Sequence, residues 1–160
     1  MRRYVIAGNW KMNFTPSQAT AFINEIKPMV AGKDNCDIVF CAPFVSIAAA
    51  MEAARELRGI NPENGYAYFI FGQCYAVTPC TEDKIGGSSI YWAAYDAMAQ
   101  AVNLLKDEPE VQKAAQQMMS AYRAAFPVQE SCFFAELTAG DRYTILCGYA
   151  AGQTTTVRYR

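Results

Sequence analysis

The chain contains no histidine among its 160 residues. This absence excludes every serine–histidine or cysteine–histidine catalytic dyad, and it excludes any metal site that needs an imidazole ligand. It also removes histidine as a general acid, a general base or an electrophile. Any chemistry performed by this chain therefore has to use other side chains.

Clusters of positive charge are also scarce. The formal net charge is −1, and the only adjacent basic pair is Arg2-Arg3. A nucleic-acid-binding protein normally presents a basic face that neutralises phosphates. The sequence therefore predicts no nucleic-acid partner.

Long apolar runs are missing as well. The first ten residues are too interrupted to form the apolar core of a signal peptide, and no uncharged apolar run reaches the roughly 18 residues of a membrane span. Apolar residues make up 52% of the chain and charged residues 18%, which is typical of globular proteins. We therefore expect a cytoplasmic chain with no membrane partner and with reduced cysteines.

The six cysteines, at positions 36, 41, 74, 80, 132 and 147, form no Cys-x-x-Cys pair. Zinc sites usually show that tight spacing. The sequence therefore predicts neither a metal nor another cofactor, and it indicates that the cysteines are small buried hydrophobic residues.

The first third of the chain predicts alternating strands and helices. Thr15 and Gln18 have the spacing of a capping box, and Pro16 suits the first position of the helix that follows. The predicted elements are strands at 3–7 and 37–42 and helices at 16–31 and 45–57, with Gly32 and Gly59 as stop signals. This β-α-β-α order indicates a parallel strand pair.

The pattern changes at Asn61–Gly65, a segment dense in turn-forming residues, which divides the chain into residues 1–60 and 61–160. The second part reads as an α+β segment. Its predicted elements are one long or two short strands within 66–78, helices at 88–106 and 109–126, a hairpin of 133–138 with 143–147, and an edge strand at 154–159.

The predicted fold class is α/β, with both parts contributing to one mixed sheet in a three-layer arrangement. The two N-terminal strands are apolar on both faces, which is the pattern of strands covered on both sides. Strands within 66–78 would extend the sheet, and the later helices would cover its second face. The competing possibility is two lobes joined at 61–65.

The motif Ala-Gly-Asn-Trp-Lys-Met-Asn at 7–13 resembles the N-terminal signature of the triosephosphate isomerases, and Cys41-Ala42-Pro43 resembles the end of their second strand. The resemblance covers about the first 57 residues and implies that they form a β-α-β-α unit like the first strands and helices of a TIM barrel. It also implies that Asn9 and Lys11 are catalytic and substrate-binding residues. The lysine would bind an anionic triose phosphate and stabilise the developing enediolate.

The family's glutamate base and neutral histidine electrophile have no counterpart that we can identify in this chain. A complete barrel runs to roughly 250 residues, so the chain is also far shorter. The resemblance thus implies a chain related to a glycolytic isomerase that lacks most of the catalytic set. Its expected partner is a small phosphorylated substrate or another anion, and a homo-oligomer is left open.

A second candidate anion site lies at Gly86, Gly87 and Ser88, just before a predicted helix, where backbone amides could face a phosphate. An ordinary flexible helix cap explains the same residues. The aromatic residues of 66–75 and 91–95 fit either a ligand pocket or simple core packing.

Two further interpretations of the whole chain remain at this point. One is a non-catalytic binding or interaction module whose function lies in residues 61–160. The other is a different enzyme that uses Lys11 as an electrophile or a Schiff-base former.

Overall fold

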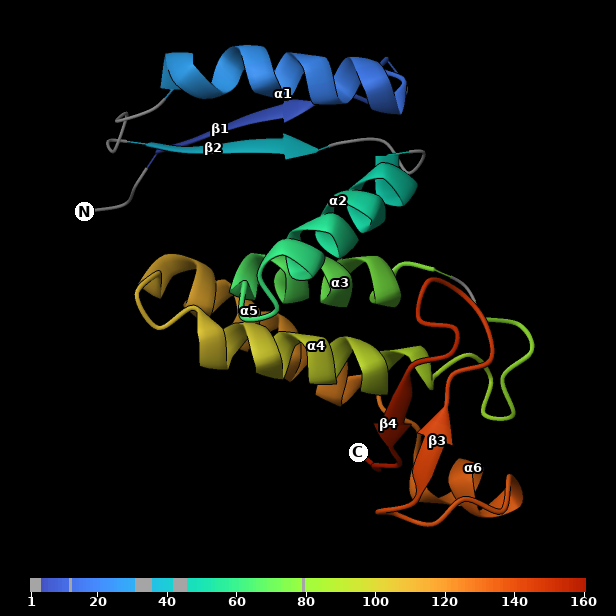
Figure 1. The fold of residues 1–160 in the computed structure, drawn as a ribbon. Helices are drawn as coiled ribbons and strands as arrows, with labels where there is room; N and C mark the ends of the chain where they lie inside the picture. Colours follow the sequence, from blue (N-terminus) through green and yellow to red (C-terminus); the bar gives the residue numbers. More distant parts are fainter. Residues whose placement is uncertain (1–3, 12, 31–35, 42–45, 79) are drawn as a thin grey trace. The chain divides into compact units, whose positions relative to one another are not determined.

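The computed structural model describes residues 4–11, 13–30, 36–41, 46–78 and 80–160 (Figure 1). The sequence-based predictions that concern Gly32, Ala42 and Pro43 lie outside the described residues. The elements in chain order are β1 (Tyr4–Asn9), α1 (Pro16–Val30), β2 (Cys36–Cys41), α2 (Ile47–Ile60), α3 (Gly65–Ala76), α4 (Ile90–Leu104), α5 (Pro109–Ala124), α6 (Gln129–Phe134), β3 (Arg142–Thr144) and β4 (Thr154–Thr156).

The chain divides into two compact units, an N-terminal unit of Met1–Ala50 and a C-terminal unit of Met51–Arg160. The division falls within α2, whereas the turn-rich segment noted in the sequence follows the end of that helix. Within the described residues, no helix is both long and apolar enough to cross a membrane.

The N-terminal unit contains the predicted parallel strand pair. β1 and β2 align in register, with Tyr4 opposite Cys36 and Asn9 opposite Cys41. α1 begins with the predicted capping box, because the Gln18 amide donates to Thr15 Oγ1 at 3.4 Å and the Thr15 amide donates to Gln18 Oε1 at 2.9 Å. The β-α-β part of the predicted order is therefore confirmed, and α2 follows it.

One face of β1 is open to solvent. Tyr4 and Ile6, which lie on the same face of the strand, are 80% and 60% exposed. The second half of the chain adds no strand to this sheet within the described residues, because β1 and β2 pair only with each other. The expected covering of both faces is therefore not found at these two residues.

The strand prediction for 66–78 is wrong, because this segment forms α3. The Asn64 side chain caps the helix, since its Oδ1 accepts hydrogen bonds from the amides of Tyr66 at 3.0 Å and Ala67 at 3.3 Å. The aromatic content had favoured a strand, yet Ile70 is the only β-branched residue in the helix. The capped start and burial of Ala67, Phe71 and Cys74 at helical spacing outweigh that content.

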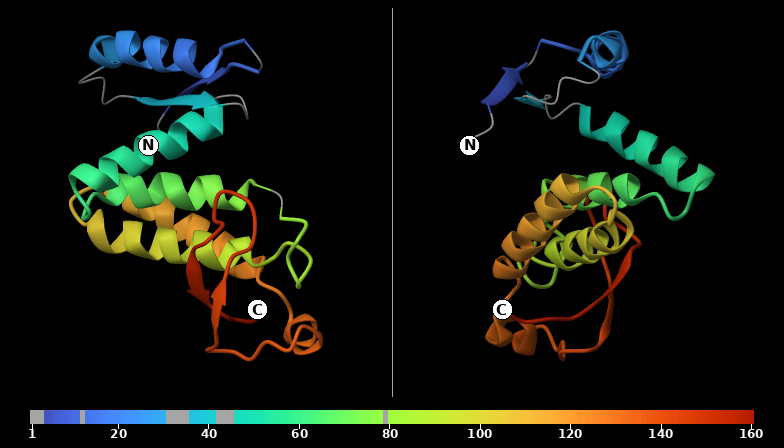
Figure 2. Two further views of the ribbon diagram at one scale, coloured as in Figure 1. Left: turned by 45° about the vertical axis from the view of Figure 1, so that its right-hand side comes forward. Right: turned by 90° about the vertical axis from the view of Figure 1, so that its left-hand side faces the viewer.

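The prediction of one mixed sheet in three layers is also wrong, because it required strands within residues 66–78. The described residues form two separate two-stranded sheets, β1–β2 and β3–β4. Without strands from 66–78, the C-terminal unit is built on helices instead, and α4 packs against both α3 and α5 (Figures 1 and 2). The molecule is a helix-rich mixture of α and β structure.

The two long predicted helices are confirmed as α4 and α5. Their apolar stripes meet in a core whose buried members are Met98, Ala101, Leu105 and Ala115. Partly buried side chains from three helices surround this core, namely Tyr68, Phe69, Val102, Val111, Met118, Met119 and Tyr122. The core of the C-terminal unit is therefore formed mainly by these two helices and α3.

The predicted hairpin of 133–138 with 143–147 is wrong. α6 occupies the first part of that segment, and Glu136, with φ of 59°, ends it in the left-handed conformation. The Leu137 amide then bonds the Cys132 carbonyl at 2.9 Å, which completes a helix C-cap. β3 pairs antiparallel with β4 instead, so the predicted edge strand at 154–159 is present as residues 154–156.

The cysteines follow the sequence-based prediction only in part. Cys80 and Cys147 form a disulfide, which contradicts the expectation that all the thiols are reduced. Cys74 and Cys132 are free and buried, as expected of small hydrophobic residues. Burial raises the pKa of the Cys74 thiol to about 11, so this side chain stays protonated at neutral pH.

Two glycines set the approach of α3 to α4. A Cβ atom on Gly72 would lie 2.9 Å from Met98 Cε and 3.1 Å from the Ala94 carbonyl oxygen. A Cβ on Gly65 would lie 2.5 Å from Leu105 Cγ. A side chain at either position therefore requires Leu105 or Met98 to shift or the two helices to separate.

We expect Gly72→Ala to destabilise the C-terminal unit by about 1–3 kcal/mol, because the overlap with α4 outweighs the better helix propensity of alanine. Gly59→Ala is the matched control, since a Cβ there meets nothing within 4 Å. That variant should instead gain about 0.5–1 kcal/mol. Urea unfolding followed by circular dichroism measures both, and equal effects of the two substitutions would contradict the close helix contact.

Candidate functional site

Asn9 and Lys11 lie where β1 ends. Asn9 is the last residue of the strand, and its Oδ1 accepts a hydrogen bond from the Lys11 amide at 3.0 Å. Lys11 is exposed and has a φ of 51°, one of two positive values among the described non-glycine residues. The asparagine side chain thus holds the backbone of the lysine in a left-handed turn.

The residue between them anchors this turn. Trp10 is only 8% exposed, and its ring meets Phe14 and Phe22 edge-on at centroid distances of 5.1 and 5.5 Å. The left-handed conformation costs a lysine roughly 1–2 kcal/mol, and such strain concentrates at functional sites. An exposed lysine whose backbone is held in one conformation at a strand end is suited to binding an anion.

The second candidate site, Gly86 to Ser88, lies in the loop before α4. Gly86 and Gly87 have φ values of 66° and 82°, which favour glycine. The Asp83 side chain folds back onto this loop, where its Oδ2 accepts from the Ser89 amide at 2.8 Å and its Oδ1 accepts from the Ile85 amide at 3.3 Å. A carboxylate of the chain itself therefore occupies the start of the helix.

Asp83 also ties this loop to β3. The Tyr143 hydroxyl donates to Asp83 Oδ1 at 3.1 Å. Burial raises the pKa of Tyr143 to about 12, and the charge of the adjacent Asp83 carboxylate contributes to the shift. The phenol therefore remains a hydrogen-bond donor at neutral pH.

The predicted site residues are divided between the two units. Asn9 and Lys11 belong to the N-terminal unit, and Gly86, Gly87 and Ser88 belong to the C-terminal unit. An anion-binding role for the glycine loop stays a prediction. In the part of the chain that the structure describes, no group of three acidic or cysteine residues could hold a metal ion.

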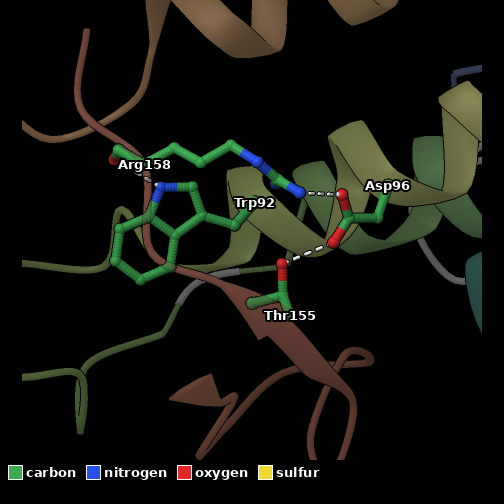
Figure 3. A network of polar contacts seen from close by, with 4 residues as sticks. All are labelled: Trp92, Asp96, Thr155 and Arg158. Atoms are coloured by element: carbon green, nitrogen blue, oxygen red, sulfur yellow. Dashed lines mark hydrogen bonds and ion pairs between the residues drawn. The ribbon is translucent and has the colours of Figure 1, made fainter. Parts of the chain in front are cut away.

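A polar network that the sequence did not indicate joins α4 to the C-terminal strand (Figure 3). Asp96 pairs with Arg158, Oδ1 to Nη2, at 2.7 Å, and its Oδ2 accepts from the Thr155 hydroxyl at 2.5 Å. The Trp92 indole donates to the Arg158 carbonyl at 2.9 Å. Asp96 and Thr155 are 59 positions apart, so no local motif could have shown this contact.

A cavity of about 360 Å³ opens beside this network. Its lining comes from α2, α3, α4 and the residues at 153–154, and it includes the aromatic side chains of Tyr68, Phe71 and Tyr75. The sequence had left open whether the aromatic residues of this segment form a pocket or a core. Phe71 and Tyr75 do both, because they are buried and also line the cavity.

Residues 4–63 match the family model described as triosephosphate isomerase. The chain is 47% identical over 55 residues to a triosephosphate isomerase of Solibacter usitatus, over 34% of this chain and 22% of that protein. It is 49% identical over 78 residues to the enzyme of Clostridium novyi, over 49% of this chain and 30% of that protein. No solved structure matches. The resemblance carried by 7–13 is therefore confirmed for the N-terminal part.

The matches leave most of each relative without a counterpart. A third relative, from Bacteroides fragilis, is 38% identical over 68 residues, or 26% of its length. The chain thus spans less than a third of the curated relatives that it matches. The match to the family model is limited to residues 4–63, which include Asn9 and Lys11 at the end of β1.

We expect Asp83→Asn to lower the free energy of unfolding by about 1–2 kcal/mol, because an amide cannot accept hydrogen bonds on both sides and loses the interaction with the helix N-terminus. Glu82→Gln is the matched control, since this neighbouring carboxylate is exposed. Denaturant unfolding monitored by tryptophan fluorescence measures both variants. A neutral Asp83→Asn substitution would refute the role assigned to this side chain.

Proposed function

We propose that this chain carries a triosephosphate isomerase-like segment that binds a small phosphorylated substrate, or another small anion, through Asn9 and Lys11 without isomerising it. The observation that carries the proposal is the left-handed turn in which Asn9 holds the Lys11 amide. It lies inside the segment that matches the isomerase family.

Binding by Lys11 rests on charge and on rigidity. The lysine follows a paired strand, and the buried Trp10 ring packs on Phe14 and on Phe22 of α1. The exposed ammonium group on this held backbone can interact with a phosphate or a developing enediolate. Asn9 contributes by fixing the backbone of the lysine.

The absence of turnover rests on the missing partners. No residue of this chain can supply the imidazole that the family uses as electrophile, because the chain has no histidine. The family match ends at residue 63, so no counterpart of the family's glutamate base is identified beyond it. Proton transfer by a positioned side chain contributes about 10²- to 10⁴-fold in rate, and a polarising donor contributes a similar factor.

The family resemblance also supplies the setting of this proposal. The setting that the resemblance implies is the cytoplasm and the triose phosphates of glycolysis, with neither nucleic acid nor membrane as a partner and with a homo-oligomer left open. The Cys80–Cys147 disulfide weighs against a reducing compartment, since disulfides are rare in the cytosol.

A second candidate function is a non-catalytic binding or interaction module in residues 61–160. The observation that favours it is the separate core of the C-terminal unit. In this core Met98 and Ala101 of α4, and Leu105 directly after the helix, are buried against neighbouring helices. This core uses no residue of the isomerase-like strands. A part with its own core can carry a function of its own.

For the purified chain we expect no interconversion of dihydroxyacetone phosphate and glyceraldehyde 3-phosphate above the buffer rate in a coupled assay. Dihydroxyacetone phosphate should nevertheless bind, and Lys11→Ala should weaken that binding by about tenfold, the order of one charge-assisted hydrogen bond. Isothermal titration calorimetry measures the binding.

Lys106→Ala serves as the control for the loss of one positive charge, because this lysine is also exposed but lies in the C-terminal unit. It should leave the binding unchanged. Turnover well above buffer that is lost in Lys11→Ala would overturn the proposed inactivity. Equal binding by the wild-type chain and Lys11→Ala would overturn the proposed site.

A further inference from the structure

The Cys80–Cys147 disulfide joins two loops of the C-terminal unit across a sequence separation of 67. Cys80 lies between α3 and α4, at the start of residues 80–89, which are called the α4 loop below, and Cys147 lies between β3 and β4. A Cβ atom on Gly148 would lie 3.3 Å from Thr78 Cγ2, so the two loops are in close contact beside the bond. A covalent link across so long a segment strongly restricts the chain. The disulfide therefore holds the α4 loop in place.

The two bonded cysteines differ in how far a reagent can reach them. Cys80 is only 7% exposed, and its carbonyl oxygen would lie 2.9 Å from a Cβ atom on Gly87. Cys147 is partly exposed. Its neighbours leave it open, because Leu146 is 50% exposed and Gly148 has no side chain. A thiol in solution therefore reaches Cys147 before Cys80.

The two buried free thiols of this unit are poor nucleophiles. Burial raises the pKa of Cys74 to about 11. Burial also raises the pKa of Cys132, and the negative charge of Asp83 adds to the effect. A disulfide is attacked by a thiolate, and both thiols are protonated at neutral pH. A reductant that opens the bond therefore has to come from solution.

We propose that Cys147 is a thiol-modification site, through which a low-molecular-weight thiol such as glutathione opens the disulfide and releases the α4 loop. The glutathione thiolate attacks Cys147 Sγ, the bond between the two Sγ atoms breaks, and its electron pair leaves on Cys80 Sγ, which takes up a proton. Cys147 then carries a mixed disulfide. A second glutathione attacks the glutathione sulfur of that disulfide, which releases Cys147 as a thiol and forms oxidised glutathione.

The opening is expected to stay local to the α4 loop. Once the disulfide is reduced, the hydrogen bond from the Tyr143 hydroxyl to Asp83 at 3.1 Å still joins this loop to β3, but it is far weaker than a covalent bond. The loop that carries Cys147 keeps its own closure, because the Gly152 amide bonds the Ile145 carbonyl at 2.9 Å. The helical core contains neither cysteine, since its buried members are Met98, Ala101, Leu105 and Ala115.

Such a switch agrees with the cytoplasmic setting of the proposed function. Disulfides in reducing compartments are mostly transient, catalytic or redox-sensing. The disulfide and the cytoplasm are therefore compatible if the bond opens and closes with the thiol pool. The inference goes beyond the proposed anion binding, because Asn9 and Lys11 take no part in it.

Reduction of the full oxidised chain by excess glutathione, at neutral pH and without denaturant, tests the proposal. Samples are alkylated with iodoacetamide and mapped by peptide mass spectrometry. We expect glutathione first on Cys147, and then Cys80 and Cys147 as alkylated thiols, while the helical circular dichroism is unchanged. A bond that stays oxidised until the helices unfold would show that the disulfide is only structural. A mixed disulfide on Cys80 instead would contradict the assigned point of attack.

Cys80→Ser and Cys147→Ser measure the difference in access, because each leaves one partner as a free thiol. With excess oxidised glutathione, Cys147 in Cys80→Ser should form a mixed disulfide at least about tenfold faster than Cys80 in Cys147→Ser. Peptide mapping gives both rates, and circular dichroism checks that both variants keep their helices. Equal rates in folded variants would refute the site. If a variant does not fold, the reduction of the unmodified chain still decides the proposal.

Trypsin cleavage after Lys84 reports the release of the α4 loop, because this lysine is exposed on it. Cleavage there should be at least about tenfold faster in the reduced chain than in the oxidised chain. Arg123 is the control site, since it is exposed near the end of α5. Cleavage after Arg123 should not change. No acceleration at Lys84, or equal acceleration at both sites, would contradict a local release.

Discussion

The C-terminal unit depends on the close contact of α3 with α4. Gly65 and Gly72 provide no side chain at this contact, so Leu105 and Met98 occupy the space directly against the backbone of α3. The resulting helix pair buries the apolar stripe of α4 on one side and holds the cavity on another. The contact also orients α4, from which Trp92 and Asp96 reach the C-terminal strand. Two glycines therefore allow the close packing of these two helices.

The sequence predicted those parts of the fold whose signals are local. The capping box of Thr15 and Gln18, the parallel strand pair and the two long amphipathic helices all appear in the structure. These features depend on neighbours within a few positions or on one clear periodicity. The strand-end residues Asn9 and Lys11 were identified in the same way, from a continuous motif.

Most of the features that the sequence did not predict depend on distant contacts. Residues 66–78 were assigned to strands from their aromatic content, whereas packing on α4 and the Asn64 cap make them a helix. The hydrogen bond of Tyr143 to Asp83 and the pair of Asp96 with Arg158 join segments that lie far apart in the sequence. The cavity is of the same kind, because its aromatic residues and its alanines come from different helices.

The isomerase-like segment and the helical unit differ in the groups that they offer to a ligand. Lys11 offers one charge on a strained turn, whereas the C-terminal unit offers a cavity lined by Arg58, Asp96 and several uncharged side chains. The exposed Tyr4 and Ile6 indicate that the strand pair gains little stability from burial within the described structure. The core of the helical unit contains none of the isomerase-like strands, so we expect the two units to open with different free energies.

Native-state hydrogen exchange of the full chain tests this independence most directly. We expect the amides of α3 and α4, including those of Phe71 and Met98, to exchange only through the largest opening of the molecule. The amides of β1, from Tyr4 to Asn9, should exchange at least about a hundredfold faster under the same conditions. Exchange of β1 and α4 with one common opening free energy, which falls together on adding urea, would show that the two units share a single cooperative core.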